Sequence, residues 1–358
     1  MTGTIRAALA ALLVLTAAAG AADEASAVYS AVRPGLWDEV VSRATLEIEA
    51  STEPSPQALY ARGLAYSRLS RFGPAERDLA PLGEFAPFPA WPPASEILAR
   101  TQKVRQLAPE HARDVGTADR VLFRVYHDED SAWVGAALEV LPTIYDRVST
   151  LYGRAFLGTP VFLFTRRADY EAFLRARAGW SPPKWHTAGG DAAGIVIWEG
   201  HLRTPGKSLG RMETWARGTL AHEFGHCVAH RYLGSDPLPP WLGEGVSELC
   251  AAFVNPEEFV RWEETMARII AEGTALPYET LFDPTGFYEA ANWQRACAQA
   301  LEMTRLLCWR IGPEGTSRLF AALRDGKGLD AALKEASGMD SLELYETALG
   351  AAQERIRE

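Results

Sequence analysis

The segment from Thr219 to His230, TLAHEFGHCVAH, carries three histidines. His222 and His226 are four residues apart, and Glu223 directly follows the first of them. On a helix this spacing puts both imidazoles on one face, about 6 Å apart along the axis, where they can bind one tetrahedral ion. Glu223 can then take a proton from a metal-bound water. The segment therefore indicates metal-assisted hydrolysis.

The same HExxH pattern also occurs by chance on surface helices that carry two solvated histidines. The apolar side chains of Leu220, Phe224 and Val228 favour the alternative, a helix held in a core. Imidazoles buried in a core need partners. Gly225 lowers the helix propensity, and we expect it to leave room beside the metal.

His230 is one turn beyond His226, which makes it a candidate for the third ligand. It lies about 12 Å from His222 along a helix axis, too far for both imidazoles to meet on one small ion. We therefore expect His230 to be a surface residue or an outer neighbour of the site. Tyr232 occupies the position six residues after His226 where a metzincin carries its third histidine.

A better third ligand follows downstream in PLPPWLGEGVSELCAAF. Glu244 comes eighteen residues after His226, behind a proline-rich turn that can reverse the chain into a second helix. Glu248 is one turn later on the same face, where it can accept a hydrogen bond from a ligand histidine and fix its tautomer. Such an acidic pair is otherwise typical of a solvated helix face.

HEFGH followed by WLGEGVSE resembles the gluzincin metallopeptidases, in particular the peptidase MA-like group, relatives of the thermolysin and aminopeptidase N families. The resemblance covers residues 115–350 in arrangement, including the helical tail. It implies an α+β, zincin-type domain in which His222, His226 and Glu244 bind Zn²⁺. It also implies that Glu223 is the general base.

The chain departs from aminopeptidase N relatives, which carry a GxMEN strand that binds the substrate's amino terminus. Here the corresponding stretch is GIVIWEG, in which only Glu199 could imitate that glutamate. The family also uses a tyrosine after the third ligand to stabilise the oxyanion. Tyr288 is the first candidate for this role and Tyr278 the second, although both could be packing residues.

The chain before this domain has two parts. MTGTIRAALAALLVLTAAAGAADEA has an early arginine, a short apolar run and then small residues, which predicts a signal peptide over residues 1–22. QALYARGLAYSRLSRFGPAERDLAPLGEFAP has residues at the offsets of a tetratricopeptide repeat, but Pro81 falls inside the expected second helix. We expect tetratricopeptide-like helical hairpins over residues 23–114, which either bind a partner or only pack.

The hydrophobic pattern changes at the start of the third part, residues 115–358. RVLFRVYH and TPVFLFT read as strands, the segments after each read as helices, and a Pro/Gly-rich loop leads into a strand at Gly194 to Trp198. This order predicts a small mixed sheet flanked by helices. Everything after Gly210 reads as helix, with a helical C-terminal subdomain from about residue 255.

Composition limits the remaining possibilities. A formal net charge of −10 without a basic cluster argues against nucleic acid as a partner. The apolar run of the signal segment is too short to span a bilayer and no later stretch qualifies, so a membrane anchor is the less favoured alternative. The signal pattern leads us to expect an exported protein in the periplasm or medium. An oxidising compartment permits disulfides among the four cysteines, but Cys297 and Cys308 fall on one predicted helix and cannot pair with each other. Four buried free thiols are the alternative.

These observations predict zinc-dependent hydrolysis of a peptide or protein substrate. We expect the strand Gly194 to Trp198 to pair with an extended substrate. Trp198 and Trp241 could line the cleft, although burial in the core is the default explanation for a tryptophan. One alternative is a catalytically weak or inactive zinc-binding scaffold, whose helical hairpins mediate protein–protein interaction. The other is a zinc hydrolase that acts on something other than peptides. An intact Glu223 argues against a purely structural site, because such a site needs no base.

Overall fold

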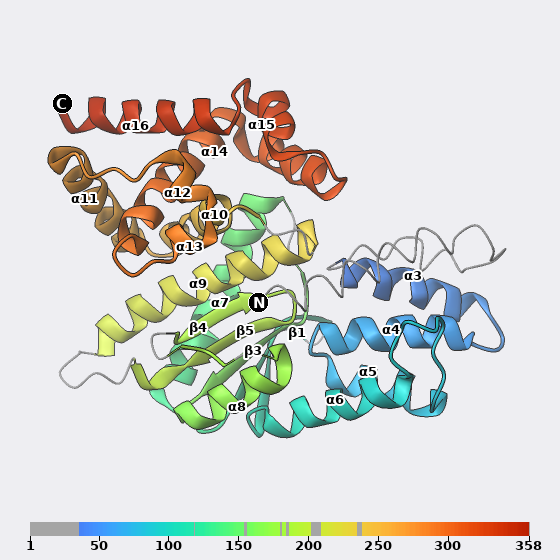
Figure 1. Cartoon of the computed structure of the whole chain (residues 1–358). Helices are drawn as coiled ribbons and strands as arrows, with labels where there is room; N and C mark the ends of the chain where they lie inside the picture. Colours follow the sequence, from blue (N-terminus) through green and yellow to red (C-terminus); the bar gives the residue numbers. More distant parts are fainter. Residues whose placement is uncertain are drawn as a thin grey trace. The chain divides into compact units, whose positions relative to one another are not determined.

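The structure is a computed structural model that describes residues 36–117, 119–153, 156–179, 181–183, 186–201, 209–234 and 238–357. The predicted signal segment, residues 1–22, lies outside these residues. The chain is an α+β protein with two compact units, Met1–Gln106 and Leu107–Glu358 (Figure 1). The boundary expected after residue 114 therefore lies eight residues earlier, after Gln106.

The described part of the first unit is helical. Its elements are α3 (Trp37–Ala50), α4 (Pro56–Arg68), α5 (Phe72–Leu79), a 3₁₀ turn η1 (Ala80–Leu82) and α6 (Ala94–Leu107). Helix α4 packs against both α3 and α5. A Cβ at Gly63 would lie 2.7 Å from Leu79 Cγ, so the glycine lets α4 and α5 approach closely. Pro81 lies in η1, beyond the end of α5.

The second unit contains a sheet of five strands. They are β1 (His111–Thr117), β2 (Arg120–His127), β3 (Thr159–Phe164), β4 (Ala188–Asp191) and β5 (Gly194–Trp198), in the spatial order β1-β2-β3-β5-β4. Strands β2, β3 and β5 are parallel, and β1 and β4 are antiparallel to their neighbours at the two edges. The mixed sheet and the strand Gly194–Trp198 are therefore as predicted, but β1 and β4 were missed.

Strand β5 is not at the edge of the sheet, because β4 covers its outer side. The prediction that Gly194–Trp198 pairs with a substrate is therefore wrong. Strand β4 comes from the segment that was expected to be a loop. Its four residues, AGGD, include neither a β-branched nor an aromatic side chain, so the sequence carries no strand signal there.

Helices cover both faces of the sheet. Helix α7 (Ala132–Tyr152) and helix α9 (Leu209–Leu233) share one apolar core with the inward side chains of β2, β3 and β5, such as Phe123, Leu163 and Ile195 (Figure 1). Helix α8 (Arg167–Ala178) packs on the other face, where Phe162 and Phe164 contact Phe173. This alternation is the period of two expected of a strand buried on both faces.

The remainder of the chain is helical, as expected. It comprises α10 (Pro240–Val254), α11 (Pro256–Glu272), α12 (Tyr278–Phe282), α13 (Pro284–Phe287), α14 (Trp293–Arg324), α15 (Leu329–Ser337) and α16 (Ser341–Arg357). Helix α14 bends at Gly312, whose φ is 66°, and it carries both Cys297 and Cys308. All four cysteines are free thiols. Within the described residues, no helix meets the length and apolarity that crossing a membrane requires.

Candidate metal centre

The candidate site lies where α9 and α10 pack against each other. Leu220, Phe224 and Val228 anchor α9 in the core, which turns His222 and His226 toward α10. A Cβ at Gly225 would lie 3.0 Å from Ser247 Cα and 3.1 Å from Cys250 Sγ, so this glycine lets the two helices approach. The space beside Gly225 is therefore occupied by α10, and is not left for the metal as expected.

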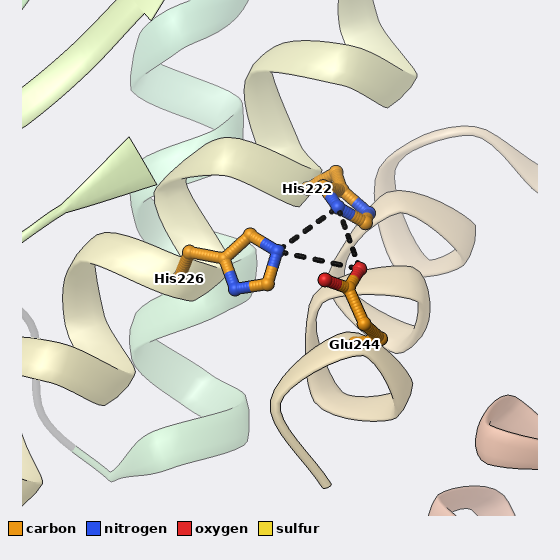
Figure 2. A group of neighbouring side chains, drawn as sticks. All are labelled: His222, His226 and Glu244. Atoms are coloured by element: carbon orange, nitrogen blue, oxygen red, sulfur yellow. Dashed lines mark hydrogen bonds and ion pairs between the residues drawn. The ribbon is translucent and has the colours of Figure 1, made fainter. Parts of the chain in front are cut away.

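The side chains of His222, His226 and Glu244 point toward one another (Figure 2). The two Nε2 atoms are 3.1 Å apart, and Glu244 Oε2 lies 3.4 Å from that of His222 and 3.5 Å from that of His226. Ligand atoms bound at 2.0–2.1 Å to a tetrahedral zinc lie about 3.3–3.4 Å from one another. The three atoms are therefore spaced as ligands of one zinc ion would be.

The chemistry of these three atoms also fits a cation. Glu248 Oε1 lies 3.4 Å from His222 Nδ1, which favours the tautomer with its proton on Nδ1 and its lone pair on Nε2. Glu244 Oε2 is buried and has no hydrogen-bond donor within the part of the chain that the structure describes. Convergent acceptors of this kind repel one another unless a positive charge lies between them.

The electrostatics of the buried groups agree with this interpretation. Burial alone would lower the pKa of His222, but the carboxylates of Glu248 and Glu244 outweigh it and hold this pKa well above its usual value. Burial would raise the pKa of Glu244, but His226 and His222 hold it well below its usual range. The site therefore keeps the Glu244 carboxylate ionised and stabilises positive charge beside it.

Two further side chains donate hydrogen bonds to the carboxylates of Glu244 and Glu248. The hydroxyl of Tyr288 donates a hydrogen bond of 2.8 Å to Glu244 Oε1, which leaves Oε2 directed at the histidines. The indole nitrogen of Trp262, on α11, donates a hydrogen bond of 2.7 Å to Glu248 Oε2. Trp262 belongs to no sequence motif, so its contact with Glu248 could not be predicted from the sequence.

Glu223 is buried beside the cluster, with 7% of its surface exposed. Burial raises its pKa, and the nearby His222 and His226 oppose this rise. A Cβ at Gly190 would overlap the backbone oxygen of Glu223, so edge strand β4 passes directly beside this residue. The structure thus brings together the predicted base, the three predicted ligands and a sheet edge.

Other residues singled out from the sequence lie elsewhere. His230 has an exposed side chain and is not part of the three-residue cluster. Tyr278 shares a hydrogen bond of 2.7 Å with Ser341 and packs against Phe282, so it is a packing residue. Glu199 is buried and accepts a hydrogen bond from Ser131 at the start of α7.

The two tryptophans considered for the cleft lining differ from each other. Trp241 is fully buried and packs near Phe282, so it follows the default expectation of a core residue and does not line a cleft. Trp198 is half-buried, and its indole donates to the backbone oxygen of Thr165 at 3.3 Å. The guanidinium of Arg167 lies over its ring, 5.0 Å from the centroid. Trp198 therefore lines the face of the sheet on which α8 packs.

A second polar pair near the site was not anticipated. The hydroxyl of Tyr170, on α8, is hydrogen-bonded to Nδ1 of His186, just before β4. Burial raises the pKa of the Tyr170 hydroxyl, and the charge of Glu223 raises it further. Burial and the neighbouring Arg167 lower the pKa of His186 to about 4. Tyr170 therefore lies within electrostatic reach of Glu223.

Comparison of the sequence with models of known protein families found no match. A search of curated proteins found no significantly similar sequence. The assignment of a function therefore depends on the geometry of the site.

Proposed function

We propose that the protein is a zinc-dependent peptidase, in which His222, His226 and Glu244 hold the metal and Glu223 is the general base. The observation that carries the proposal is the convergence of three acceptor atoms at the spacing of tetrahedral zinc ligands, with a buried glutamate beside them. In this proposal the second unit is a zincin-type domain of the gluzincin class. The first unit is a tetratricopeptide-like helical array.

Zinc bound at such a site acidifies water and polarises a carbonyl group. The carboxylate of Glu223 takes the proton from the attacking water and can return it to the departing amide nitrogen. Burial raises the pKa of Glu223, which moves it toward neutrality, where general bases work best. Tyr288 holds Glu244 in place through its hydroxyl, and it remains our candidate donor to the oxyanion.

Strand β4 offers the substrate a docking edge in place of β5. The Trp198 amide donates to the Thr187 oxygen at 2.8 Å. Since bonding alternates along an antiparallel pair, the backbone groups of Ala188 and Gly190 face away from β5. An extended peptide added at this edge would pass beside Glu223. This arrangement supports a peptide or protein substrate, bound largely through its backbone.

Replacing Glu223 with glutamine tests the proposal. Glutamine keeps the shape of the side chain but removes the proton acceptor, so turnover on denatured protein substrates should fall at least about a hundredfold. Zinc content should stay at the wild-type level, because Glu223 is not a ligand in this account. Cleavage at the wild-type rate would contradict the proposal, and a wild-type protein that binds zinc but cleaves nothing would favour the scaffold.

A further inference from the structure

We infer that Trp262 is a positioning residue of the metal centre, which acts on His222 through Glu248. The inference rests on the proposed zinc function and extends it to α11. The indole N–H of Trp262 reaches Glu248 Oε2 at 2.7 Å, while Glu248 Oε1 lies 3.4 Å from Nδ1 of His222. The three side chains therefore form one chain of contacts from α11 through α10 to α9.

This chain matters because Glu248 is a buried carboxylate, with 6% of its surface exposed. A buried carboxylate needs donors on both oxygens, and a missing donor leaves it free to rotate or to take up a proton. Either change would loosen its hold on Nδ1 of His222. The imidazole could then turn, or shift its proton to Nε2, the atom that faces Glu244 and His226.

The surrounding contacts hold the indole in place. Trp262 is buried to 6% exposure, and the guanidinium of Arg261 lies over its ring, 4.4 Å from the centroid. Arg261 is itself held by an ion pair of 2.7 Å with Glu258. Asn255 caps α11 and also donates to the backbone oxygen of Thr214, at 3.1 Å, which ties this helix to α9.

Trp262→Phe removes the indole N–H but keeps an aromatic ring in the core. The chain offers a matched control in Trp133 on α7, which is 3% exposed. Its indole nitrogen is buried and has no hydrogen-bond partner among the residues that the structure describes. Trp133→Phe therefore makes the same chemical change in a buried site without breaking a hydrogen bond.

The measurement is the dissociation constant for zinc, determined by competition with a chromophoric chelator. Outer partners of zinc ligands typically contribute 10–100-fold to affinity, and Trp262 is one contact further out, so Trp262→Phe should weaken binding about tenfold. Trp133→Phe should bind zinc as the wild type does. Glu248→Gln should weaken zinc binding at least as much as Trp262→Phe does. Adding Trp262→Phe to Glu248→Gln should cause no further loss of affinity.

Wild-type affinity in Trp262→Phe, an equal loss in Trp133→Phe, or additive losses in the double variant would each overturn the inference. Failure of the wild type to bind zinc would instead overturn the proposed function. Should Trp262→Phe not fold, Arg261→Ala is the second test, since this guanidinium is half exposed and stacks on the indole. We expect Arg261→Ala to weaken zinc binding about twofold through the same contacts. Unchanged zinc affinity in this variant would overturn the inference.

Discussion

The second unit contains two pairs of histidines in which the two rings face each other. The surroundings of the two pairs differ. His222 and His226 lie one turn apart on α9, with ring centroids separated by 4.8 Å. His111 and His127 lie opposite each other on β1 and β2, with centroids separated by 5.5 Å. Each pair has an acidic neighbour. Only the first pair has the geometry of a metal centre.

The difference lies in the third acceptor. At the first pair, Glu244 directs a buried oxygen between the two rings. At the second pair, Asp130 Oδ1 is 3.7 Å from Nδ1 of His127, but the same oxygen accepts a hydrogen bond of 2.7 Å from Arg113. Among the described residues, no third ligand atom joins this pair. Convergence of acceptors, rather than proximity of histidines, distinguishes a metal centre.

Close helix packing makes the convergence possible. Glu244 lies on α10, which packs against both α9 and α14. A Cβ at Gly245 would overlap Thr304 Oγ1 and the backbone oxygen of Ala300 on α14. At Gly243, two residues earlier, the nearest heavy atom would be Leu238 Cβ at 4.0 Å. The two glycines of α10 therefore offer a direct test of this difference.

The larger predicted effect concerns this helix contact. Gly245→Ala should lower the free energy of unfolding by roughly 1–3 kcal/mol, because α10 and α14 must move apart to admit the methyl group. It should also weaken zinc binding by displacing Glu244. Gly243→Ala should leave zinc binding unchanged and stabilise the protein by up to about 1 kcal/mol through helix propensity. Urea unfolding and zinc competition measure both.

Both substitutions carry the same gain in helix propensity. The difference between their free energies of unfolding therefore reports the contact of α10 with α14. Equal stability of the two variants would show that close packing of α10 does not support the cluster. Retention of wild-type zinc affinity in Gly245→Ala would show that zinc binding does not depend on the contact between α10 and α14.

A smaller effect should appear in the pH dependence of zinc binding. In the metal-free protein the pKa of His222 is raised above its unfolded-state pKa of about 6.5. Protonation of His222 therefore stabilises the fold fully below the unfolded-state pKa. This contribution is lost as pH rises through the folded-state pKa. The depressed pKa of Glu244 matters only at acid pH, where its contribution is lost as pH falls. Zinc must displace the His222 proton.

The stabilisation by zinc should therefore grow from pH 6 to pH 8, by up to about 1.4 kcal/mol per pH unit for one displaced proton. Thermal unfolding at fixed free zinc, with and without the metal, measures this slope. His127→Ala should show the wild-type slope, whereas His222→Ala should show none. A flat profile in the wild type would mean that no histidine proton is exchanged for zinc.

Parts of this arrangement could be predicted from sequence, for local reasons. Residues four apart on a helix must share a face, which placed His222 and His226 together. The proline-rich turn before Glu244 and the one-turn spacing to Glu248 placed both carboxylates on the returning helix. Strand β5 was recognisable because GIVIW is a continuous run of apolar residues after a glycine.

The parts that the sequence did not reveal depend on tertiary contacts. Strand β1 has a single buried residue, Val115, so its pattern carries no periodicity. Strand β4 consists of small residues whose role appears only where Gly190 meets α9. The contact of Trp262 with Glu248 joins two helices, and no local pattern encodes it. Such contacts follow from how the helices pack, which spacing along the chain does not specify.

The central claim is that three convergent acceptors hold the metal, and the most direct test is the zinc content of purified protein. We predict one zinc per chain in the wild type and in His127→Ala, and a loss of zinc in Glu244→Ala. His230→Ala should keep its zinc, because its exposed side chain lies outside the cluster. Zinc retained in Glu244→Ala, or lost in His127→Ala or His230→Ala, would contradict the account.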